Sequence, residues 1–287
     1  MEDRETLVLE VGGKRYVDCQ EIGHGGFSKV YRATDAETHE AVAVKVYKSD
    51  FNNREIEQVL NNSVRTHGFL DPNSRRFPKF LYRGNNSYSM SFIEGCNLGC
   101  LDLPQREDIV LAAGYQIALC LDEFHKSRPE KPIIHRDLKP GNIIIRQDGG
   151  FVLTDFDFAY IDEQSVDMDR IIGTQQFLSP EHISGKQLLP ISDLFSLGST
   201  LYNLLTGKVV IKSDSEYLEE GVTVGLTYIH DGNIGEVIAT CWRRRRTYES
   251  AEHMVAELRD RLKRNGINFE KSQNILAQMV KTGFWPR

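Results

Sequence analysis

The stretch His135-Arg136-Asp137-Leu138-Lys139-Pro140-Gly141-Asn142 lies near the middle of the 287-residue chain, between Ile133-Ile134 and Ile143-Ile144-Ile145. All of its residues except Leu138 are polar or turn-forming, whereas both flanks are apolar, so the pattern predicts a loop between buried segments. A turn does not need a carboxylate, an ammonium and an amide within six residues. Asp137, Lys139 and Asn142 therefore indicate chemistry rather than a purely structural loop.

A second acidic motif, Thr154-Asp155-Phe156-Asp157, begins at the end of the apolar run Phe151–Leu153. This run and Ile143–Ile145 predict two brief strands around a glycine-containing turn. Carboxylate and amide oxygens are ligands that suit Mg²⁺. Asp155 and Asn142 are therefore candidate metal ligands.

Towards the N-terminus, Ile22-Gly23-His24-Gly25-Gly26-Phe27-Ser28-Lys29-Val30 lies between two predicted strands. Because glycine has no side chain, the backbone N–H groups of such a segment can approach a polyphosphate closely. Taken alone, the segment fits a plain glycine-rich turn equally well. No helix follows it, as a dinucleotide-binding fold requires, and no Gly-Lys-Ser/Thr follows either.

Ala41-Val42-Ala43-Val44-Lys45-Val46 places one lysine in an apolar strand, 22 positions after Gly23. In an isolated strand, a lysine that reaches out to solvent is the simpler interpretation. Beside a loop that holds phosphates, a buried ammonium needs anionic partners. Those partners would be the phosphates and a carboxylate on the next helix.

The order of glycine loop, strand lysine, His-Arg-Asp loop and Asp-Phe segment resembles the signature set of eukaryotic-type (Hanks-type) Ser/Thr protein kinases. The resemblance extends from about Gly12 to Leu262. It implies an α+β, two-lobed fold: a small antiparallel β-sheet lobe with one main helix (1–94), a larger helical lobe (95–265) and a C-terminal extension (266–287). It also implies transfer of the ATP γ-phosphoryl group to Ser/Thr hydroxyls of proteins, with Mg²⁺.

Apolar periodicity agrees with a change of character near residues 91–97. The predicted strands are 6–11, 15–20, 30–33, 40–47, 80–83 and 87–92, and the predicted helices are 54–64, 108–125, 194–205 and 250–262. In the extension, an apolar pattern predicts a helix that packs on the larger lobe or docks a partner; its members are Phe269, Ile275, Leu276, Met279 and Val280.

The resemblance implies a role in nucleotide binding for each matching residue. Ile22 and Val30 would cover the adenine, Ile144 would close the pocket from below, and Met90 would be the gatekeeper. Ser91 and Ile93 would offer backbone groups to the adenine. The implied nucleotide-binding set is Ile22, Gly23, His24, Gly25, Gly26, Phe27, Ser28, Lys29, Val30, Ala43, Lys45, Met90, Ser91, Ile93, Ile144 and Asp155.

For catalysis, the resemblance implies that Asp137 accepts the proton of the substrate hydroxyl and that Lys139 steadies the transferred group. Lys45 would hold the α- and β-phosphates and pair with Glu55, with Glu57 as the alternative. The implied catalytic set is Asp137, Lys139, Asn142, Lys45 and Glu55, and the implied metal ligands are Asn142 and Asp155. Lys139 with Thr174 favours Ser/Thr substrates. Asp193 would brace the backbone of the catalytic loop.

Four positions depart from the family pattern. Ser28 replaces the third loop glycine, and Asp157 replaces the glycine after Asp-Phe, where a side chain would hinder an inactivating flip. Glu55 follows Lys45 by only ten positions. Thr247 falls where a late arginine is expected, so that Arg245 or Arg246 would pair with the glutamate of Ser179-Pro180-Glu181 instead.

The resemblance implies that Arg136 pairs with a phosphorylated residue of the segment between Asp155 and Glu181, where such a residue exists. Ser165 is the candidate phosphosite in this chain. Acidic side chains surround it, namely Asp162, Glu163, Asp167 and Asp169. We therefore expect acidic groups to replace part of the role of a phosphate. Two copies would associate transiently where autophosphorylation occurs.

Composition limits the remaining alternatives. A net charge of −6 argues against nucleic acid as a partner, and no apolar stretch reaches the roughly 20 residues of a membrane span. Five scattered cysteines form no disulfide framework, and the first residues do not resemble a signal peptide, which predicts a cytoplasmic protein. The alternatives to an active kinase are a pseudokinase that acts as a nucleotide-responsive scaffold and a small-molecule kinase.

Overall fold

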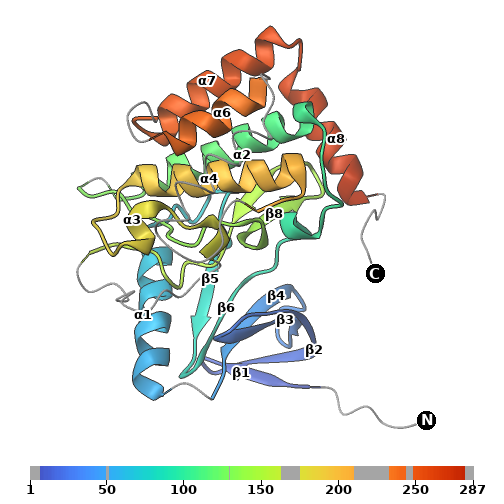
Figure 1. The fold of residues 1–287 in the computed structure, drawn as a ribbon. Coiled ribbons are helices and arrows are strands. Elements are labelled where there is room, and N and C mark those ends of the chain that lie inside the picture. The colour runs from blue at the N-terminus through green and yellow to red at the C-terminus, as the bar shows by residue number, and fades with distance from the viewer. Residues whose placement is uncertain are drawn as a thin grey trace. The chain divides into compact units, whose positions relative to one another are not determined.

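The computed structural model describes residues 7–49, 52–128, 130–162, 175–209, 233–243 and 248–281. The chain divides into two compact units, Met1–Glu94 and Gly95–Arg287, and each is described by itself (Figure 1). An antiparallel sheet dominates the first unit and helices dominate the second. The fold is therefore α+β, as predicted.

The first unit contains a six-stranded antiparallel sheet with the order β1-β2-β3-β4-β6-β5. Its strands are β1 (Leu9–Val11), β2 (Lys14–His24), β3 (Ser28–Asp35), β4 (Ala41–Tyr47), β5 (Phe80–Arg83) and β6 (Ser87–Ser91). All six predicted strands are present. Strand β2 continues beyond its predicted end because Gly23 and His24 still pair with Val30 and Lys29 of β3.

The two faces of this sheet have different chemistry. One face carries an apolar cluster of Val11, Tyr16, Ala33, Val42 and Val44. Because side chains alternate along a strand, the other residues of β4 point to the opposite face. The register places residues of four sequence-predicted roles on that opposite face: Val30, Ala43, Lys45 and Met90.

Helix α1 (Asn53–Phe69) is longer than the predicted helix 54–64. It begins after Asn52, whose side chain accepts a hydrogen bond from the backbone of Glu55 at 3.0 Å. Near its other end, the His67 ring lies 5.9 Å from Tyr88 and 5.7 Å from Phe80. Tyr88 is the register partner of Lys45, so α1 packs on the face of the sheet that carries the lysine (Figure 1).

The second unit contains the helices α2 (Glu107–Lys126), α3 (Pro180–Ile183), α4 (Pro190–Thr206), α6 (Asn233–Trp242), α7 (Ala251–Arg264) and α8 (Phe269–Lys281). Helix α2 contacts α4, α6, α7 and α8, and Figure 1 shows it between α4 and α7. This central position explains why most of the side chains of α2 are buried. The helices predicted at 108–125, 194–205 and 250–262 are all present.

A small antiparallel sheet of β7 (Gly95–Asn97), β8 (Ile143–Arg146) and β9 (Phe151–Leu153) lies in the same unit. Strands β8 and β9 were predicted, but β7 was not. Its three residues, Gly-Cys-Asn, have no apolar alternation that a sequence pattern could detect. The strand forms because Gly95 allows a close approach: a Cβ there would lie 2.2 Å from the carbonyl oxygen of Ile145.

Helix α8 packs on α2 and β8, as one of the two interpretations of the C-terminal pattern predicted. Leu276 and Ala277 of this helix are buried. The turn between β8 and β9 also lies against α8, because a Cβ on Gly149 would lie 2.2 Å from the carbonyl oxygen of Gln273. Gly149 has a φ of +80°, which favours glycine in addition.

We expect Gly149→Ala to lower the free energy of unfolding by about 2–5 kcal/mol, from the overlap with Gln273 and the left-handed backbone together. Gly185→Ala is the matched control, since Gly185 has a φ of +63° but nothing within 4 Å of an added Cβ. The control should cost about 1–2 kcal/mol in urea unfolding. Equal losses in the two variants would show that α8 does not press on the turn.

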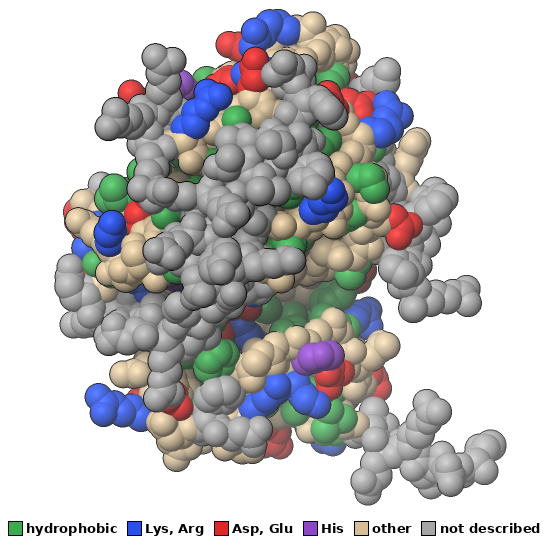
Figure 2. Space-filling view, viewed as in Figure 1, with side chains coloured by type: hydrophobic (Ala, Val, Ile, Leu, Met, Phe, Trp, Pro, Cys, Tyr) green, Lys and Arg blue, Asp and Glu red, His purple; other side chains and the backbone are tan. Residues whose placement is uncertain are grey.

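The surface of the protein carries charges of both signs (Figure 2). On the face drawn in Figure 2, the basic and acidic side chains of the described residues are interspersed, and no large patch of them carries a single sign of charge.

All five cysteines are free thiols, and burial raises the pKa of Cys96 to about 12. Among the described helices, none has the length and apolar character to cross a membrane.

Candidate active site

The loop 135–142 brings two polar side chains, those of Lys139 and Asn142, onto the carboxylate of Asp137. The Lys139 ammonium lies 2.7 Å from Oδ2 of Asp137, and Nδ2 of Asn142 lies 2.9 Å from the same oxygen. Nδ2 of Asn142 also donates to the backbone carbonyl of Asp137 at 2.8 Å. Asp137 and Asn142 are buried, so this carboxylate is held by donors on a largely covered loop. The three residues singled out in the sequence therefore form one cluster.

The β8–β9 pairing places the second acidic motif beside this cluster. The backbone N–H and the hydroxyl of Thr154 both donate to the carbonyl oxygen of Asn142, at 2.9 and 3.1 Å. Nε2 of His135 lies 3.0 Å from the carbonyl oxygen of Thr154. Asp155 follows directly, with a left-handed backbone at φ +66°. Asn142 and Asp155 therefore lie at the same end of the hairpin.

The oxygen atoms of Asn142 and Asp155 at this end of the hairpin are suitable ligands for a divalent cation. The Asn142 amide nitrogen donates to Asp137, which leaves the amide oxygen for a cation. Asp155 adds a carboxylate one residue after Thr154. Within the described ranges no cluster of three or more His, Cys, Asp or Glu side chains forms a metal site. A cation here would therefore complete its shell with water or phosphate oxygens, as Mg²⁺ commonly does.

Asp193, near the start of α4, holds the backbone of the loop 135–142. Its carboxylate accepts hydrogen bonds from the backbone N–H of His135 at 2.8 Å and of Arg136 at 3.0 Å. The His125 ring is 2.9 Å from the same carboxylate. Burial alone would raise the pKa of Asp193, but the His125 hydrogen bond, the nearby histidines and the His135 N–H lower it overall. Asp193 is thus a buried anion that fixes the loop.

Two phenylalanine rings pack against the ring of His135, the first residue of the loop. Phe156 stacks on Phe124 at a centroid distance of 5.2 Å and meets the edge of His135 at 5.7 Å. Both phenylalanines are fully buried. The packing therefore links α2, the loop 135–142 and the Asp-Phe segment. Sequence reasoning did not identify Phe124, since an aromatic residue on a helix is usually a core residue.

Asp157 lies in a buried position, 2 % exposed, immediately after this aromatic contact. Its backbone is outside the left-handed region, in contrast to Asp155. A residue with a side chain is therefore accommodated without backbone strain. The expected hindrance of a flip by Asp157 stays a prediction.

The glycine loop of the first unit is the turn between β2 and β3. Gly25 donates its N–H to the carbonyl oxygen of Ser28 at 2.8 Å, and Lys48 donates from Nζ to the carbonyl oxygen of Gly25 at 2.6 Å. Gly23, Gly25 and Gly26 all lack a left-handed φ, and a Cβ on any of them would meet nothing within 4 Å. Neither conformation nor internal packing requires glycine at these positions. The open space around these glycines leaves room for the close approach of a ligand, and phosphate binding by this loop stays a prediction.

Lys45 is 3 % exposed, so the interpretation as a solvent-reaching lysine is wrong. Its Nζ lies 5.8 Å from the ring centroid of Tyr47, two residues along the same face. Glu55 lines a small cavity together with Tyr47 and Phe27, and its Oε2 accepts a hydrogen bond from the Asn52 backbone at 3.4 Å. Glu55 therefore belongs to the first turn of α1, beside the face that carries the lysine. The Lys45–Glu55 pair stays a prediction.

Other predicted nucleotide residues lie on strands or at their ends. Ile22 of β2 is 48 % exposed. Ser91 is the last residue of β6, and Ile93 follows it before the boundary of the first unit. Ile144 belongs to β8 in the second unit. Joint action of residues from both units on one nucleotide stays a prediction.

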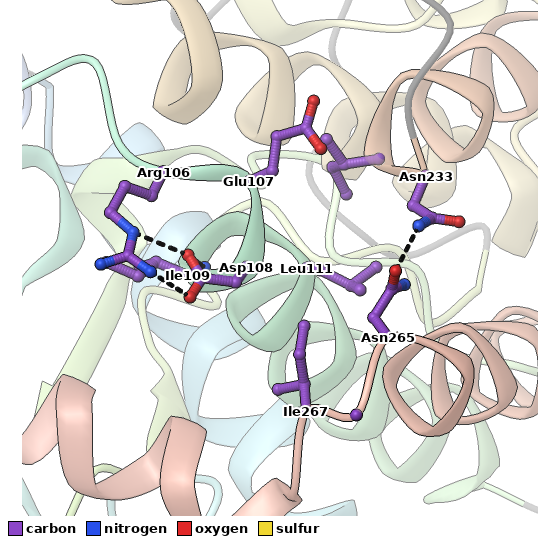
Figure 3. Close-up of a pocket in the computed structure, with 10 residues that line it drawn as sticks. Arg106, Glu107, Asp108, Ile109, Leu111, Asn233, Asn265 and Ile267 are labelled. Carbon is purple, nitrogen blue, oxygen red and sulfur yellow. Dashed lines mark hydrogen bonds and ion pairs between the residues drawn. The ribbon is translucent and has the colours of Figure 1, made fainter.

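A cavity of about 530 Å³ lies elsewhere in the second unit, at the N-termini of α2 and α6 and the C-terminus of α7. Figure 3 shows the Arg106–Asp108 ion pair and the Asn233–Asn265 hydrogen bond in its wall. No sequence-predicted site residue lines it. It also borders Asn233, the first residue described after 209, and we assign it no role.

Several predicted features lie outside the described residues. These are Ser165, Thr174, Glu163, Asp167 and Asp169 of the segment after Asp162, together with Arg245, Arg246 and Thr247. Glu181, the expected partner of a late arginine, is described at the start of α3. The proposals on these residues remain sequence-based.

Residues 16–224 match the family model described as "Protein kinase domain". A probable serine/threonine-protein kinase of Clostridium perfringens is 30% identical over 235 residues, which cover 78% of this chain and 33% of the relative. The serine/threonine-protein kinase PknA of Corynebacterium glutamicum is 31% identical over 73% of this chain and 45% of its own length. A serine/threonine-protein kinase of Arabidopsis thaliana, AtPK1/AtPK6, is 32% identical over 71% of this chain and 45% of its length. The aligned regions therefore cover less than half of each of these relatives.

Proposed function

The chain belongs to the protein kinase domain family, in its Hanks-type Ser/Thr group, and on that premise we propose that it transfers the ATP γ-phosphoryl group to Ser/Thr hydroxyls of proteins. The observation that carries the proposal is the convergence of Lys139 and Asn142 on one carboxylate oxygen of Asp137. Retention of these groups with Lys45 and Asp155 favours an active enzyme over a nucleotide-responsive pseudokinase.

In the proposed reaction, the hydroxyl oxygen of the substrate attacks the γ-phosphorus of ATP, and Asp137 accepts the hydroxyl proton. The bond between the γ-phosphorus and the oxygen that leaves with ADP breaks. The ammonium of Lys139, already beside Asp137, balances the negative charge of the transferred group. The hydrogen bonds from Asn142 orient the carboxylate before the substrate arrives. Positioning and electrostatics of this kind supply most of the catalysis in phosphoryl transfer.

The cofactors in this proposal are ATP and Mg²⁺. Asn142 and Asp155 would hold the metal, which supplies charge neutralisation at the phosphates. Lys45 would contact the α- and β-phosphates and pair with Glu55. The glycine loop supports phosphate binding because its glycines face open space.

The proposed partners are ATP and protein substrates, without nucleic acid, and with transient self-association during autophosphorylation. We place the protein in the cytoplasm, which the five free thiols support. Net charge −6 supports the exclusion of nucleic acid.

Incubation of the full chain with γ-labelled ATP and Mg²⁺, with a generic basic protein or a small hydroxylated acceptor supplied in parallel reactions, tests the proposal. Label on Ser or Thr, identified by phosphoamino-acid analysis, is the expected result. A chain that binds nucleotide and labels no protein would support the pseudokinase. Label found only on a small hydroxylated acceptor would support the small-molecule kinase.

We expect Gly25→Ala to weaken nucleotide binding by about 10- to 100-fold, through loss of close backbone hydrogen bonds to charged phosphate. The free energy of unfolding should change by less than about 0.5 kcal/mol, because the added Cβ meets nothing within 4 Å. Titration with Mg-nucleotide and urea unfolding measure the two effects. Gly68→Ala is the control: its Cβ also meets open space, but on α1. Similar affinity in both variants would contradict the phosphate-binding role of the loop.

A further inference from the structure

The side chain of Arg136 in the catalytic loop lies against an aromatic ring. Its guanidinium carbon is 4.6 Å from the ring centroid of Tyr160, a distance at which a cation–π interaction is favourable. The backbone N–H of Arg136 is bonded at the same time to Asp193. Both ends of this arginine therefore have defined partners in the described part of the second unit.

Tyr160 is fixed from several directions. Its backbone exchanges two hydrogen bonds with Ile134, Tyr160 N to Ile134 O at 2.7 Å and Ile134 N to Tyr160 O at 3.0 Å. The ammonium of Lys131 lies 4.9 Å from the ring centroid and 3.3 Å from the hydroxyl oxygen. The ring thus lies within reach of two cations and is tied to the residue that precedes the catalytic loop.

The residues after Tyr160 are also held by the loop that precedes the catalytic motif. Arg128 donates to the carbonyl oxygen of Ile161 at 2.8 Å and lies 3.9 Å from the carboxylate of Asp162. A third neighbour of Arg136 is His182 in α3, whose pKa is lowered to about 4 by burial and then by the charge of Arg136. His182 is therefore neutral near pH 7.

We propose that Tyr160 is a built-in anchor for Arg136, which holds the catalytic loop in position without a phosphate on residues 163–174. The inference rests on the proposed kinase function. It differs from the sequence-based hypothesis, in which acidic side chains take the place of the phosphate. The ring supplies an attractive face for the guanidinium, and the Ile134–Tyr160 pairing fixes that face in the unmodified chain. Tyr160 is thus a positioning residue that acts through Arg136.

The test compares phosphate-free full-length protein, verified by intact mass, in four forms: wild type, Tyr160→Phe, Tyr160→Leu and Arg136→Gln. Wild type should be active without phosphate. Tyr160→Phe, which keeps the ring, should remain within about threefold of the wild-type kcat, whereas Tyr160→Leu should lose about tenfold. The KM for ATP should change little in either variant, because the ring acts on the catalytic loop.

A double mutant separates this role from a general loss of packing. If the ring acts through Arg136, Tyr160→Leu adds no further loss of kcat in the Arg136→Gln background. Additive losses, a Phe variant as weak as the Leu variant, or a wild type that is active only when phosphorylated would each overturn the inference.

Hydrogen exchange of the amides at 135–137 gives a readout that does not depend on catalysis. Faster exchange in Tyr160→Leu, with wild-type exchange in Tyr160→Phe, supports the anchor even if no kinase substrate is found. Unchanged exchange in Tyr160→Leu contradicts it. An inactive wild type with this exchange pattern would count against the proposed function alone.

Discussion

Asp137→Asn should reduce the kcat for phosphoryl transfer by about 10²- to 10⁴-fold. The substitution keeps an oxygen that can accept from Lys139 and Asn142, so the hydrogen bonds that shape the loop are largely conserved. It removes the carboxylate that accepts the hydroxyl proton. The rate of label transfer from γ-labelled ATP, with kcat and KM determined separately, measures the effect.

The free energy of unfolding of Asp137→Asn should stay within about 1 kcal/mol of the wild type, because the ammonium of Lys139, 25 % exposed, stays hydrated when the ion pair is lost. Asp148→Asn is a matched control, because Asp148 is an exposed carboxylate, 45 % exposed, paired with Arg146 in the same unit. The control should keep kcat within about twofold. Equal labelling by wild type and Asp137→Asn would show that the chemistry occurs at another site or in a contaminant.

Asp193→Asn should lower the free energy of unfolding by about 3–5 kcal/mol, as expected when one partner of a buried ionic network is lost. The carboxylate accepts from three donors, the His125 ring and the backbone N–H groups of His135 and Arg136. An amide in its place would turn an N–H₂ group towards one of these donors. Urea unfolding measures the loss, and kcat should fall as well because the catalytic loop is released.

Two further variants keep this prediction testable where Asp193→Asn folds poorly. His125→Ala removes a single contact to the carboxylate and should cost about 1–3 kcal/mol. Glu252→Gln removes an exposed ion pair with Lys126, in which Glu252 is 71 % exposed, and should cost less than about 1 kcal/mol. Similar costs for the buried and the exposed variants would contradict the assigned role of Asp193.

The pH dependence of Asp193 follows from the direction of its shift. Its pKa in the folded chain lies below the ordinary value of 3.8, so the folded state favours the ionised form. The resulting stabilisation is present above the unfolded pKa and is lost as the pH falls through the folded pKa. The difference in unfolding free energy between wild type and Asp193→Asn should therefore be nearly constant from pH 7 to pH 5. A difference that already shrinks in this range would contradict the shift.

Much of the fold was predictable because its signals are local. Alternation of apolar residues located the six strands of the first sheet, and the loop at 135–142 was visible from its polar residues between apolar flanks. Helix α1 was predicted too short, since its second half carries the polar residues Asn62, Ser63, Thr66 and His67 on the buried side. Their burial depends on tertiary contacts, such as that of His67 with Tyr88, which a periodicity of apolar residues does not detect.

The candidate site was predictable in its residue types and less so in its supports. Asp137, Lys139 and Asn142 are close in sequence, so their convergence follows from the loop itself. Phe124 and His125 support the loop from α2, and Tyr160 reaches Arg136 across 24 positions. An aromatic or histidine residue at such a position has no local signal that separates a support from ordinary core packing.

The sequence by itself determined the family, the strand pattern and the identity of the reactive groups, because these depend on residue type, order and short spacing. The tertiary structure alone decided that Lys45 is buried, that Gly149 lies against Gln273, and that a tyrosine ring faces Arg136. Each of these is a contact or a burial that segments far apart in the chain create when they pack. Packing responds to the shape of the whole unit, so short-range patterns do not encode such contacts.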